Sequence, residues 1–341
     1  MTKRSELQGV GAALLSIALA APTAAAAPAR LALGVDPKEP RRVVVWMEGA
    51  GLFGSEDAGE TWRGLATRPR SVARIAFADG GVLLLGTDDG LLRSDDGGRT
   101  FTRSGGFPAG PVIDVASAGS ALFAVGETGV FRSVDGGRSF RSAGVPGHAF
   151  HPYRIRSSPR VPNQVVLVSS GLLHRSDDGG ETWRRVPAGP EFDYGWVAWG
   201  VGDPPATLAA NRKGIFRSTD GGASWKPVSG SPTLLRSLWV PDPSSDKYLL
   251  ISVLAQSEDG QQEATGMTKG FYRTLDGAKS WSSNLSPDGT LVIEAGFASG
   301  RVDVLYVTTE SGGVFRSANK GESWRAVTPP AASARKTGGD R

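Results

Sequence analysis

The sequence predicts an all-β protein, a seven-bladed β-propeller, and three observations support this fold. An eight-residue motif, S-x-D-x-G-x-[ST]-[WF], which we call the box, recurs in five copies and in two degenerate ones. The spacing of the copies, 39 to 56 residues, is typical of one four-stranded blade per repeat. Each repeat also contains short apolar runs bounded by Gly and Asp. After residue 27 the sequence has no sustained apolar pattern with the 3.6-residue period of a helix. The third residue of each of the seven boxes is, in chain order, Asp57, Asp96, Asp135, Asp178, Asp220, Asp276 and Asn319.

The second repeat shows the expected strands of one blade, counted from the innermost outward. Its apolar runs are Val72 to Ala78, Val82 to Gly86, Gly90 to Ser94 and Thr100 to Ser104. The box therefore lies in the turn between the third and fourth strands. Because complete repeats occur at both ends, we expect the ring to close by packing alone, without a shared strand. The predicted blades are 31–66, 71–104, 111–142, 148–187, 194–229, 234–284 and 291–327.

The N-terminal segment resembles a secretory signal peptide. Lys3 and Arg4 precede an apolar run from Val10 to Ala21 and a small-residue exit near Ala26. We therefore expect residues 1–27 to be a signal peptide and the protein to be exported, periplasmic or extracellular, with no stable membrane insertion after cleavage; the alternative is an uncleaved anchor. Residues 28–330 form the expected propeller, and residues 331–341 a flexible basic tail.

Composition excludes several classes of site. The 341 residues include no Cys, which excludes disulfides, thiolate metal sites and a cysteine nucleophile. The net charge of +4 is small and of mixed sign along every repeat, so we expect no nucleic-acid partner. The only histidines, His148, His151 and His174, lack a third ligand at metal spacing, so we predict no metal and no cofactor.

The residue types of the box are those that stabilise a hairpin. Its Asp can accept hydrogen bonds from turn amides, its Gly can adopt a positive φ, and its hydroxyls can cap loose backbone groups. We expect its aromatic residue to pack between neighbouring blades. An Arg precedes most boxes and is expected to stack on that aromatic or to pair with the box. These arginines are Arg93, Arg132, Arg175, Arg217, Arg273 and Arg316.

The motif resembles the Asp-box or BNR repeat of sialidases, xyloglucan-cleaving glucanases, sortilin-type receptors and photosystem II stability and assembly factors. This resemblance covers residues 31 to 327 and implies boxes that lie away from the ligand-binding face, so Asp57 and its equivalents are structural. The enzymes differ from this chain: Tyr153-Arg154-Ile155 is followed by Arg156 where sialidases have Pro, and the glucanases use two propellers. A single exported propeller is most similar to the assembly factors and sortilin-type receptors, which implies a protein client.

We expect binding on the face opposite the boxes, where the turns between second and third strands lie. These turns carry Glu48, Asp88 with Asp89, Glu127 and Glu310, which would form an acidic arc facing Arg212 and Lys213. Such an arc suits a charged peptide or a cation. The alternative is that turns simply favour acidic residues. The long insertion at 256–269 lies in the corresponding turn of the sixth blade.

Two further groups of residues are candidate sites. Arg74, Asp114, Arg236 and Glu294 on the inner strands are expected in the central channel, either as solvated polar groups or, for Asp114 and Glu294, as weak catalytic candidates. Glycoside hydrolysis needs two carboxylates about 5 to 9.5 Å apart. Tyr194 and Trp196 would form a stacking surface for sugar or peptide, or else pack in the core.

The sequence thus favours an exported, non-enzymatic propeller that binds a protein or peptide through the face opposite the boxes. The alternative from another class is a glycoside hydrolase, sialidase-like or glucanase-like, or a glycan-binding propeller. A third hypothesis is a purely structural surface protein.

Overall fold

The structure is a computed structural model. It describes residues 30–145, 152–158, 161, 163–169, 172–186, 196–199, 206–211, 213–233, 235–242, 245, 247–253, 270–297 and 301–330. The predicted signal peptide, the basic tail, the insertion at 256–269 and the residues Tyr194, Arg212, His148 and His151 lie outside these ranges.

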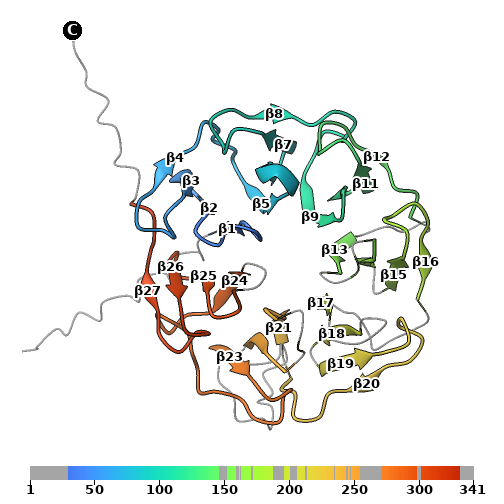
Figure 1. The fold of residues 1–341 in the computed structure, drawn as a ribbon, viewed down its shortest axis with the longest axis vertical. Coiled ribbons are helices and arrows are strands. Elements are labelled where there is room, and N and C mark those ends of the chain that lie inside the picture. The colour runs from blue at the N-terminus through green and yellow to red at the C-terminus, as the bar shows by residue number, and fades with distance from the viewer. Residues whose placement is uncertain are drawn as a thin grey trace, which may run out of the picture.

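Seven antiparallel sheets are arranged around a central axis, which the innermost strands face, and this confirms the predicted seven-bladed propeller (Figure 1). Within the described residues six sheets have four strands and the sixth blade has three. There the segment at 282–285 takes the fourth place, because Ser282 N donates to Arg273 O at 2.9 Å and Leu285 N to Phe271 O at 2.7 Å.

The first blade comprises β1 Leu31–Val35, β2 Val43–Met47, β3 Gly51–Ser55 and β4 Arg63–Gly64; the second β5 Val72–Phe77, β6 Leu83–Thr87, β7 Gly90–Ser94 and β8 Thr102–Arg103, with the 3-10 turn η1 Asp79–Gly81; the third β9 Val112–Ala118, β10 Ala121–Gly126, β11 Gly129–Ser133 and β12 Arg141–Ser142.

The remaining four blades continue this order around the ring. The fourth comprises β13 Pro152–Ser157, β14 Val165–Ser169, β15 Leu172–Ser176 and β16 Arg184–Arg185; the fifth β17 Trp196–Trp199, β18 Thr207–Asn211, β19 Gly214–Ser218 and β20 Lys226–Pro227; the sixth β21 Leu235–Trp239, β22 Leu249–Val253 and β23 Gly270–Thr274; the seventh β24 Val292–Phe297, β25 Leu305–Thr309, β26 Val314–Ser317 and β27 Arg325–Ala326.

The core lies between blades, which explains the composition of the second strands. Every residue of β6, LLLGT, is buried, because one face packs on the preceding blade and the other on the following blade. The outermost strands have two residues each and are mostly exposed, so their unpaired edge is short.

The ring closes between the seventh and first blades by side-chain packing, as predicted. Val43 and Val45 share a buried cluster with Tyr306 and Val314. The hydroxyl of Tyr306 donates to Pro40 O at 2.9 Å. Each described sheet consists of strands from one blade, so no strand is shared across this seam.

The box of the fourth blade shows how the motif closes its turn. Ser176 Oγ accepts a bond from Gly180 N at 2.7 Å and donates to Asp178 Oδ1 at 2.8 Å. Asp178 also accepts from the hydroxyl and the amide of Thr182, at 2.5 and 2.9 Å. These hydrogen bonds, that from the Thr182 hydroxyl first, lower the pKa of Asp178 to about 2. The carboxylate thus accepts hydrogen bonds from groups of its own turn.

The two degenerate boxes keep this geometry. Asn319 Oδ1 accepts from Ser323 N at 3.0 Å, and its Nδ2 donates to Ser323 Oγ at 2.9 Å. Ala278 stands at the Gly position with φ +70°. The aromatic residues pack between blades as expected: the indole of Trp62, for example, donates to Val327 O of the seventh blade at 2.9 Å.

Three of the arginines that precede the boxes, Arg93, Arg132 and Arg273, reach a partner that the sequence did not indicate, the box of the following blade. Arg93 Nε donates to Gly136 O at 2.6 Å, and Arg273 Nη1 to Lys320 O at 2.7 Å. Pairing within the same box also occurs, since Arg93 contacts Asp95. The first blade has Gly54 at this position, and there Arg63 Nη2 donates to the equivalent carbonyl, Gly97 O, at 2.6 Å.

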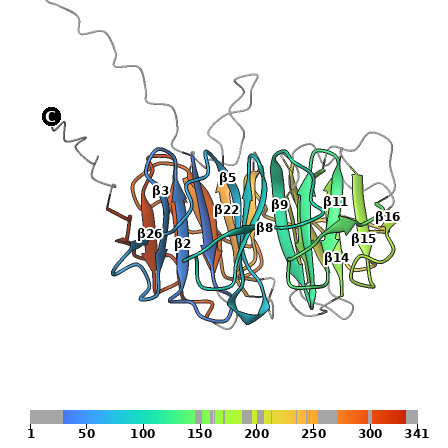
Figure 2. The same ribbon diagram turned by 90° about the horizontal axis from the view of Figure 1, so that it is seen from above.

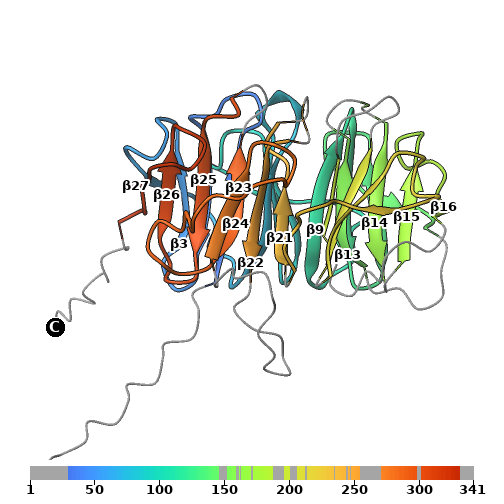
Figure 3. The same cartoon turned by 90° about the horizontal axis from the view of Figure 1, so that it is seen from below.

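The two faces of the ring carry different turns (Figures 2 and 3). The boxes lie beside the turns between first and second strands: Gly179 N donates to Asn163 O, and Ala58 N to Arg41 O, both at 2.8 Å. We call this side the box face, and the opposite side, with the turns at 48–50, 88–89, 127–128 and 310–313, the loop face. Within the described part of the chain, no helix has the length and apolar character needed to cross a membrane.

Candidate functional site

A repeated irregularity of the inner strands positions three of the predicted channel residues. The pairing register shifts by one residue immediately before Arg74 on β5, Asp114 on β9 and Glu294 on β24. Such a β-bulge bends the strand and re-aims the side chain that follows it. The three residues therefore occupy equivalent positions on three blades.

Four charged side chains form a row of ion pairs across the inner strands, which we call the charge chain. Arg74 Nε donates to Asp114 Oδ1 at 2.7 Å, and Arg74 Nη1 is paired with Glu294. The other oxygen of Asp114 accepts from Arg156 Nη1 at 2.7 Å. The order is thus Glu294, Arg74, Asp114 and Arg156, with two anions and two cations. Arg236, the fourth predicted channel residue, is exposed on β21.

The two carboxylates also bind backbone amides of the next blade. Asp114 Oδ2 accepts from Ile155 N at 3.0 Å, and Glu294 Oε2 from Leu33 N at 3.1 Å. The charge chain therefore joins blades seven and one through Glu294, and blades three and four through Asp114.

The pKa values of the two carboxyl groups move in opposite directions. Burial raises the pKa of Glu294, and the charge of Arg74 opposes this only in part. Burial would also raise the pKa of Asp114, but Arg156 and Arg74 outweigh it, so its pKa lies below the ordinary value. Asp114 is fully buried, and both of its oxygens accept bonds from protein groups. These two weak catalytic candidates are thus brought together, but with an arginine between them.

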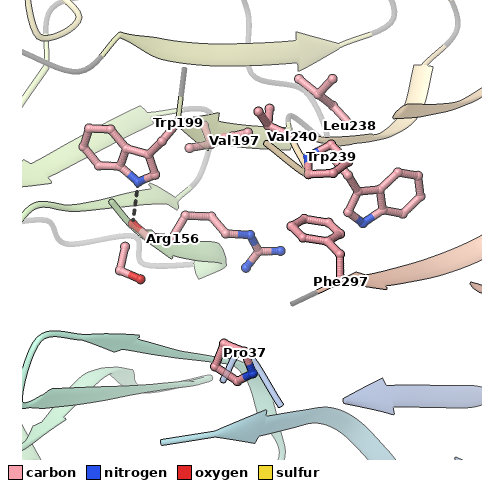
Figure 4. Close-up of a pocket in the computed structure, with 11 residues that line it drawn as sticks. Pro37, Arg156, Val197, Trp199, Leu238, Trp239, Val240 and Phe297 are labelled. Carbon is pink, nitrogen blue, oxygen red and sulfur yellow. Dashed lines mark hydrogen bonds between the residues drawn. The ribbon is translucent and has the colours of Figure 1, made fainter. Parts of the chain in front are cut away.

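A cavity of about 280 Å³ opens beside the charge chain, at the box-face ends of the inner strands (Figure 4). Blades four to seven supply most of its wall, and Pro37 of the first blade lies on the opposite side. Its lining residues are Pro37, Arg156, Ser157, Val197, Ala198, Trp199, Leu238, Trp239, Val240, Pro241 and Phe297.

The lining is apolar except at one end. Trp199, Trp239 and Phe297 are the last residues of three successive inner strands, so they lie at one level around the central axis. The indoles of Trp199 and Trp239 are largely buried in two different clusters between blades. Among the described residues of the lining, Arg156 has the only charged side chain and Ser157 the only hydroxyl group. The indole of Trp199 donates to Arg156 O at 3.3 Å. The arrangement suits an apolar group that carries, or lies beside, one charged or hydrogen-bonding group.

Sequence reasoning did not identify this cavity. In the sequence, Arg156 stands out only as a departure from a sialidase motif, and Trp239 and Phe297 belong to no recognised motif. A signal was present, because large aromatic residues end the inner strands of blades five, six and seven. The positions of those ends could be read from the predicted blade boundaries only to within a few residues.

The predicted loop-face residues lie in the turns where they were expected. Glu48, Asp88, Glu127 and Lys213 are exposed, and Glu310 is half-buried. Asp88 and Asp89 line a polar cavity of about 420 Å³ with Arg70 and Arg103, whose Nη2 is 3.1 Å from Asp89 Oδ1.

The other acidic residues of the predicted arc, Glu48, Glu127 and Glu310, do not line that cavity. The arc therefore stays a prediction.

Trp196 begins β17, while its expected partner Tyr194 and the basic residue Arg212 are outside the described ranges. His174 is buried on β15, and the described residues contain no group of three metal-ligating side chains.

No protein-family model and no curated protein matches the sequence. Among solved structures the chain is similar to YCF48 bound to D1 peptide, with 16% identity, a TM-score of 0.54 and coverage of 75% of this chain and 80% of that one. It is also similar to an ancestral GH74 enzyme (17%, TM-score 0.63, 88% and 46%). A third is a catalytically inactive virginiamycin B lyase from Staphylococcus aureus with quinupristin (12%, TM-score 0.60, 85% and 94%). At such identities the likeness concerns the fold alone.

Proposed function

We propose that this protein is a non-enzymatic propeller scaffold that binds a protein or peptide partner, and that the cavity lined by Trp199, Trp239 and Phe297 receives one apolar side chain of that partner. The observation that carries the proposal is the mainly apolar lining that the described residues give this cavity, with Arg156 at one end. The YCF48 structure, in which a propeller of similar fold holds a peptide, supports a peptide as the ligand class.

The composition of the cavity favours a peptide side chain over a glycan. A sugar ring carries several hydroxyl groups, and burying them without partners costs free energy. Among the described lining residues the polar side chains are Arg156 and Ser157, together with the indole N–H groups of Trp199 and Trp239. The indole of Trp199 donates to Arg156 O. An aromatic or aliphatic side chain would instead bury apolar surface on apolar surface.

The glycoside hydrolase alternative has less support. The described residues that line the cavity include no carboxylate, and Asp114, one of the two candidates, is fully buried. The likeness to the ancestral GH74 enzyme spans 46% of that chain and adds no site residue.

The proposed site differs in position from the loop face that the sequence favoured. The loop-face residues Glu48, Asp88, Glu127, Lys213 and Glu310 remain candidates for a second contact with the same partner. The proposal also includes export, which is supported by the signal-like pattern of residues 1–27.

Selection from a displayed peptide library tests the proposal. Peptides selected on the wild-type protein should share one aromatic or aliphatic position, and V240D or F297A should weaken their binding at least tenfold. V134D, which changes an exposed box-face residue away from the cavity, is the matched control and should bind as the wild type does.

Two results would contradict the proposal. One is binding that survives V240D and F297A but is lost in K213E, which would place the site on the loop face. The other is turnover of a sialoside or β-glucan by the purified protein.

A further inference from the structure

We propose that the box face carries a second docking site, for the carboxylates of an acidic protein or peptide segment, at the boundary between the fifth and sixth blades. The site consists of Lys226, the first residue of β20, and Lys279, the sixth residue of the following box; we call it the lysine site. Both side chains are exposed. The lysine site is separate from the cavity of the proposed function and does not depend on it.

The other blades show what these two positions do in the ring. The outermost strand begins with a cation in five blades, at Arg63, Arg141, Arg184, Lys226 and Arg325. Arg325 forms an ion pair with Glu60, the sixth residue of the box in the next blade around the ring. Arg141 Nη2 lies 4.0 Å from Oε1 of Glu181, which has the same place in its box. The two positions therefore face each other across a boundary between blades, and a glutamate pairs there with the cation.

The other two arginines at the start of an outermost strand have an acidic residue in their own box. Arg63 Nη2 lies 3.8 Å from Glu56 Oε1, and Arg184 Nε lies 3.8 Å from Asp177 Oδ2. Both acids are the second residue of a box. In each of these four blades, therefore, the cation has a carboxylate within 4.0 Å.

Lys226 has neither kind of acidic partner. The second residue of its own box is Thr219, and the sixth residue of the next box is Lys279, a second cation. Neither lysine side chain has a hydrogen bond or an ion pair with any residue that the structure describes. The boundary between the fifth and sixth blades thus has two cations at the positions where two other boundaries have a cation and an anion.

Packing across this boundary brings the sixth box against the end of the fifth blade. The indole of Trp281, in that box, donates to Gly230 O at 2.8 Å. A Cβ added to Gly230 would lie 3.7 Å from the Cα of Lys279. Gly230 follows β20 by three residues, so both lysines belong to one part of the box face.

A cavity of about 320 Å³ opens beside Lys226, and its described lining includes no carboxylate. The other lining residues are Arg217, Thr219, Ser224, Pro227 and Val228. Arg217 has another interaction partner, so we assign the site to the two lysines alone. The hydroxyl of Thr219 lies where other boxes have an acid, and it adds a hydrogen-bonding group without negative charge.

The chemistry of the ligand follows from the other boundaries. Two like charges in neighbouring positions repel each other, and an anion bound between them removes this repulsion. Glu60 and Glu181 supply that anion elsewhere in the ring, so the ligand group is a carboxylate. An exposed ion pair contributes little by itself, and salt screens it. The partner segment therefore presents two or three adjacent acidic residues, and its binding is strongest at low salt.

The test uses the full chain labelled with 5-fluorotryptophan and two blocked peptides, N-acetyl-Glu-Glu-Glu-amide and N-acetyl-Gln-Gln-Gln-amide. Fluorine NMR signals of Trp225 and Trp281, which lie next to the two lysines in the sequence, report binding. They are assigned with W225F and W281F, because Phe occurs natively at this box position. At about 20 mM salt the Glu peptide should bind at least fivefold more tightly than the Gln peptide, and at about 300 mM this preference should disappear.

Variants separate the lysine site from general charge. K226Q and K279Q should each weaken binding of the Glu peptide about three- to fivefold. R99Q is the matched control, because Arg99 is an exposed cation at the sixth position of the second box, and it should change binding less than about 1.5-fold. K279E should pair with Lys226 as Glu60 pairs with Arg325, which should abolish the preference for the Glu peptide and raise the unfolding temperature by about 1 to 2 °C.

Three outcomes would overturn the inference. Equal affinities for the Glu and Gln peptides would refute the carboxylate requirement. Losses in R99Q as large as those in the lysine variants would show diffuse attraction to positive charge and no local site. Binding of N-acetyl-phosphoserine-amide that is tighter than that of the Glu peptide would assign the site to a phosphorylated partner. F297A should bind the Glu peptide as the wild type does, so failure here is distinct from failure of the proposed cavity.

Discussion

The Nε atom of Arg132 donates a 2.6 Å hydrogen bond to the carbonyl oxygen of Gly179, which lies in the box of the following blade. Arg93, one blade earlier, and Arg273, three blades later, make the same kind of contact, to Gly136 and Lys320. The acceptor carbonyl belongs in each case to the fourth residue of a box, where φ is positive. The box thus closes its own hairpin and also presents a carbonyl acceptor to an arginine of the preceding blade.

Replacing this arginine should loosen one blade interface. Arg132 is 11% exposed and also contacts Glu181 at 2.7 Å, so R132A should lower the free energy of unfolding by about 1.5 to 3 kcal/mol. Denaturant unfolding measures the loss. R141A is the control, because Arg141 is 71% exposed and 4.0 Å from the same carboxylate, and it should change stability by less than about 0.5 kcal/mol. Equal losses in the two variants would contradict a role for the Gly179 contact.

The native Asn319 predicts which substitutions the box tolerates. D178N should keep the acceptor for the amide of Thr182 and cost less than D178A, which we expect to cost about 1 kcal/mol. Thermal unfolding of both variants at pH 7 compares them. A D178N variant as unstable as D178A would show that charge, and not acceptor geometry, maintains the turn.

The same residue predicts a pH dependence. The folded pKa of Asp178, about 2, lies below its unfolded value, so its contribution is present above about pH 4 and is lost as the pH falls toward 2. The difference in stability between the wild type and D178N should therefore shrink over this interval. A difference that stays constant from pH 6 to pH 2 would contradict the lowered pKa.

Backbone conformation predicts opposite effects for two substitutions at the same box position. Ala278 has φ +70°, a conformation that costs an alanine about 1 kcal/mol more than a glycine, so A278G should raise the unfolding temperature. Gly180 has φ +82°, and a Cβ there would overlap the ring of Phe123, so G180A should lower it. Calorimetry of the two variants tests both signs, and a destabilised A278G would be inconsistent with strain at this position.

Removing the central arginine of the charge chain should be among the costliest single changes. R74M leaves Asp114 with Arg156 alone and Glu294 without its cation, and breaking a buried pair costs about 3 to 5 kcal/mol. R236M, on an exposed inner-strand residue, is the control and should cost less than about 0.5 kcal/mol. Denaturant unfolding at pH 7 measures both.

The loss in R74M should also be smaller under acid conditions. The pKa of Glu294 is already raised in the folded protein, and without Arg74 it rises further, so acid neutralises this carboxyl group before most others. A loss that is the same at pH 4.5 and pH 7 would contradict a buried, ionised Glu294 in the variant.

Local motifs made the fold predictable. Each box needs only eight consecutive residues to close its turn, so seven copies revealed the number of blades and most of their boundaries. The missing fourth strand of the sixth blade was not foreseen, because the segment at 282–285 keeps two backbone hydrogen bonds to β23 without forming a regular ladder.

The candidate site was predictable only in part. Arg74, Asp114 and Glu294 were correctly placed on inner strands, since alternation along a strand is local. Their pairing was not predictable, because Arg74 and Glu294 are 220 residues apart and meet only when the ring closes. The ends of the inner strands are likewise scattered in the chain, so the gathering of Trp199, Trp239 and Phe297 could not be read from any one segment.

The amino-acid sequence by itself determined the all-β class, the sevenfold repeat and the structural role of Asp178 and its equivalents, because these depend on contacts within one hairpin. Only the tertiary structure decided that Arg132 binds the next blade, that Arg74 joins two carboxylates, and that Arg156 lies in an aromatic cavity on the box face. The physical reason is closure: the packing of seven similar sheets around one axis brings distant inner strands within hydrogen-bonding distance.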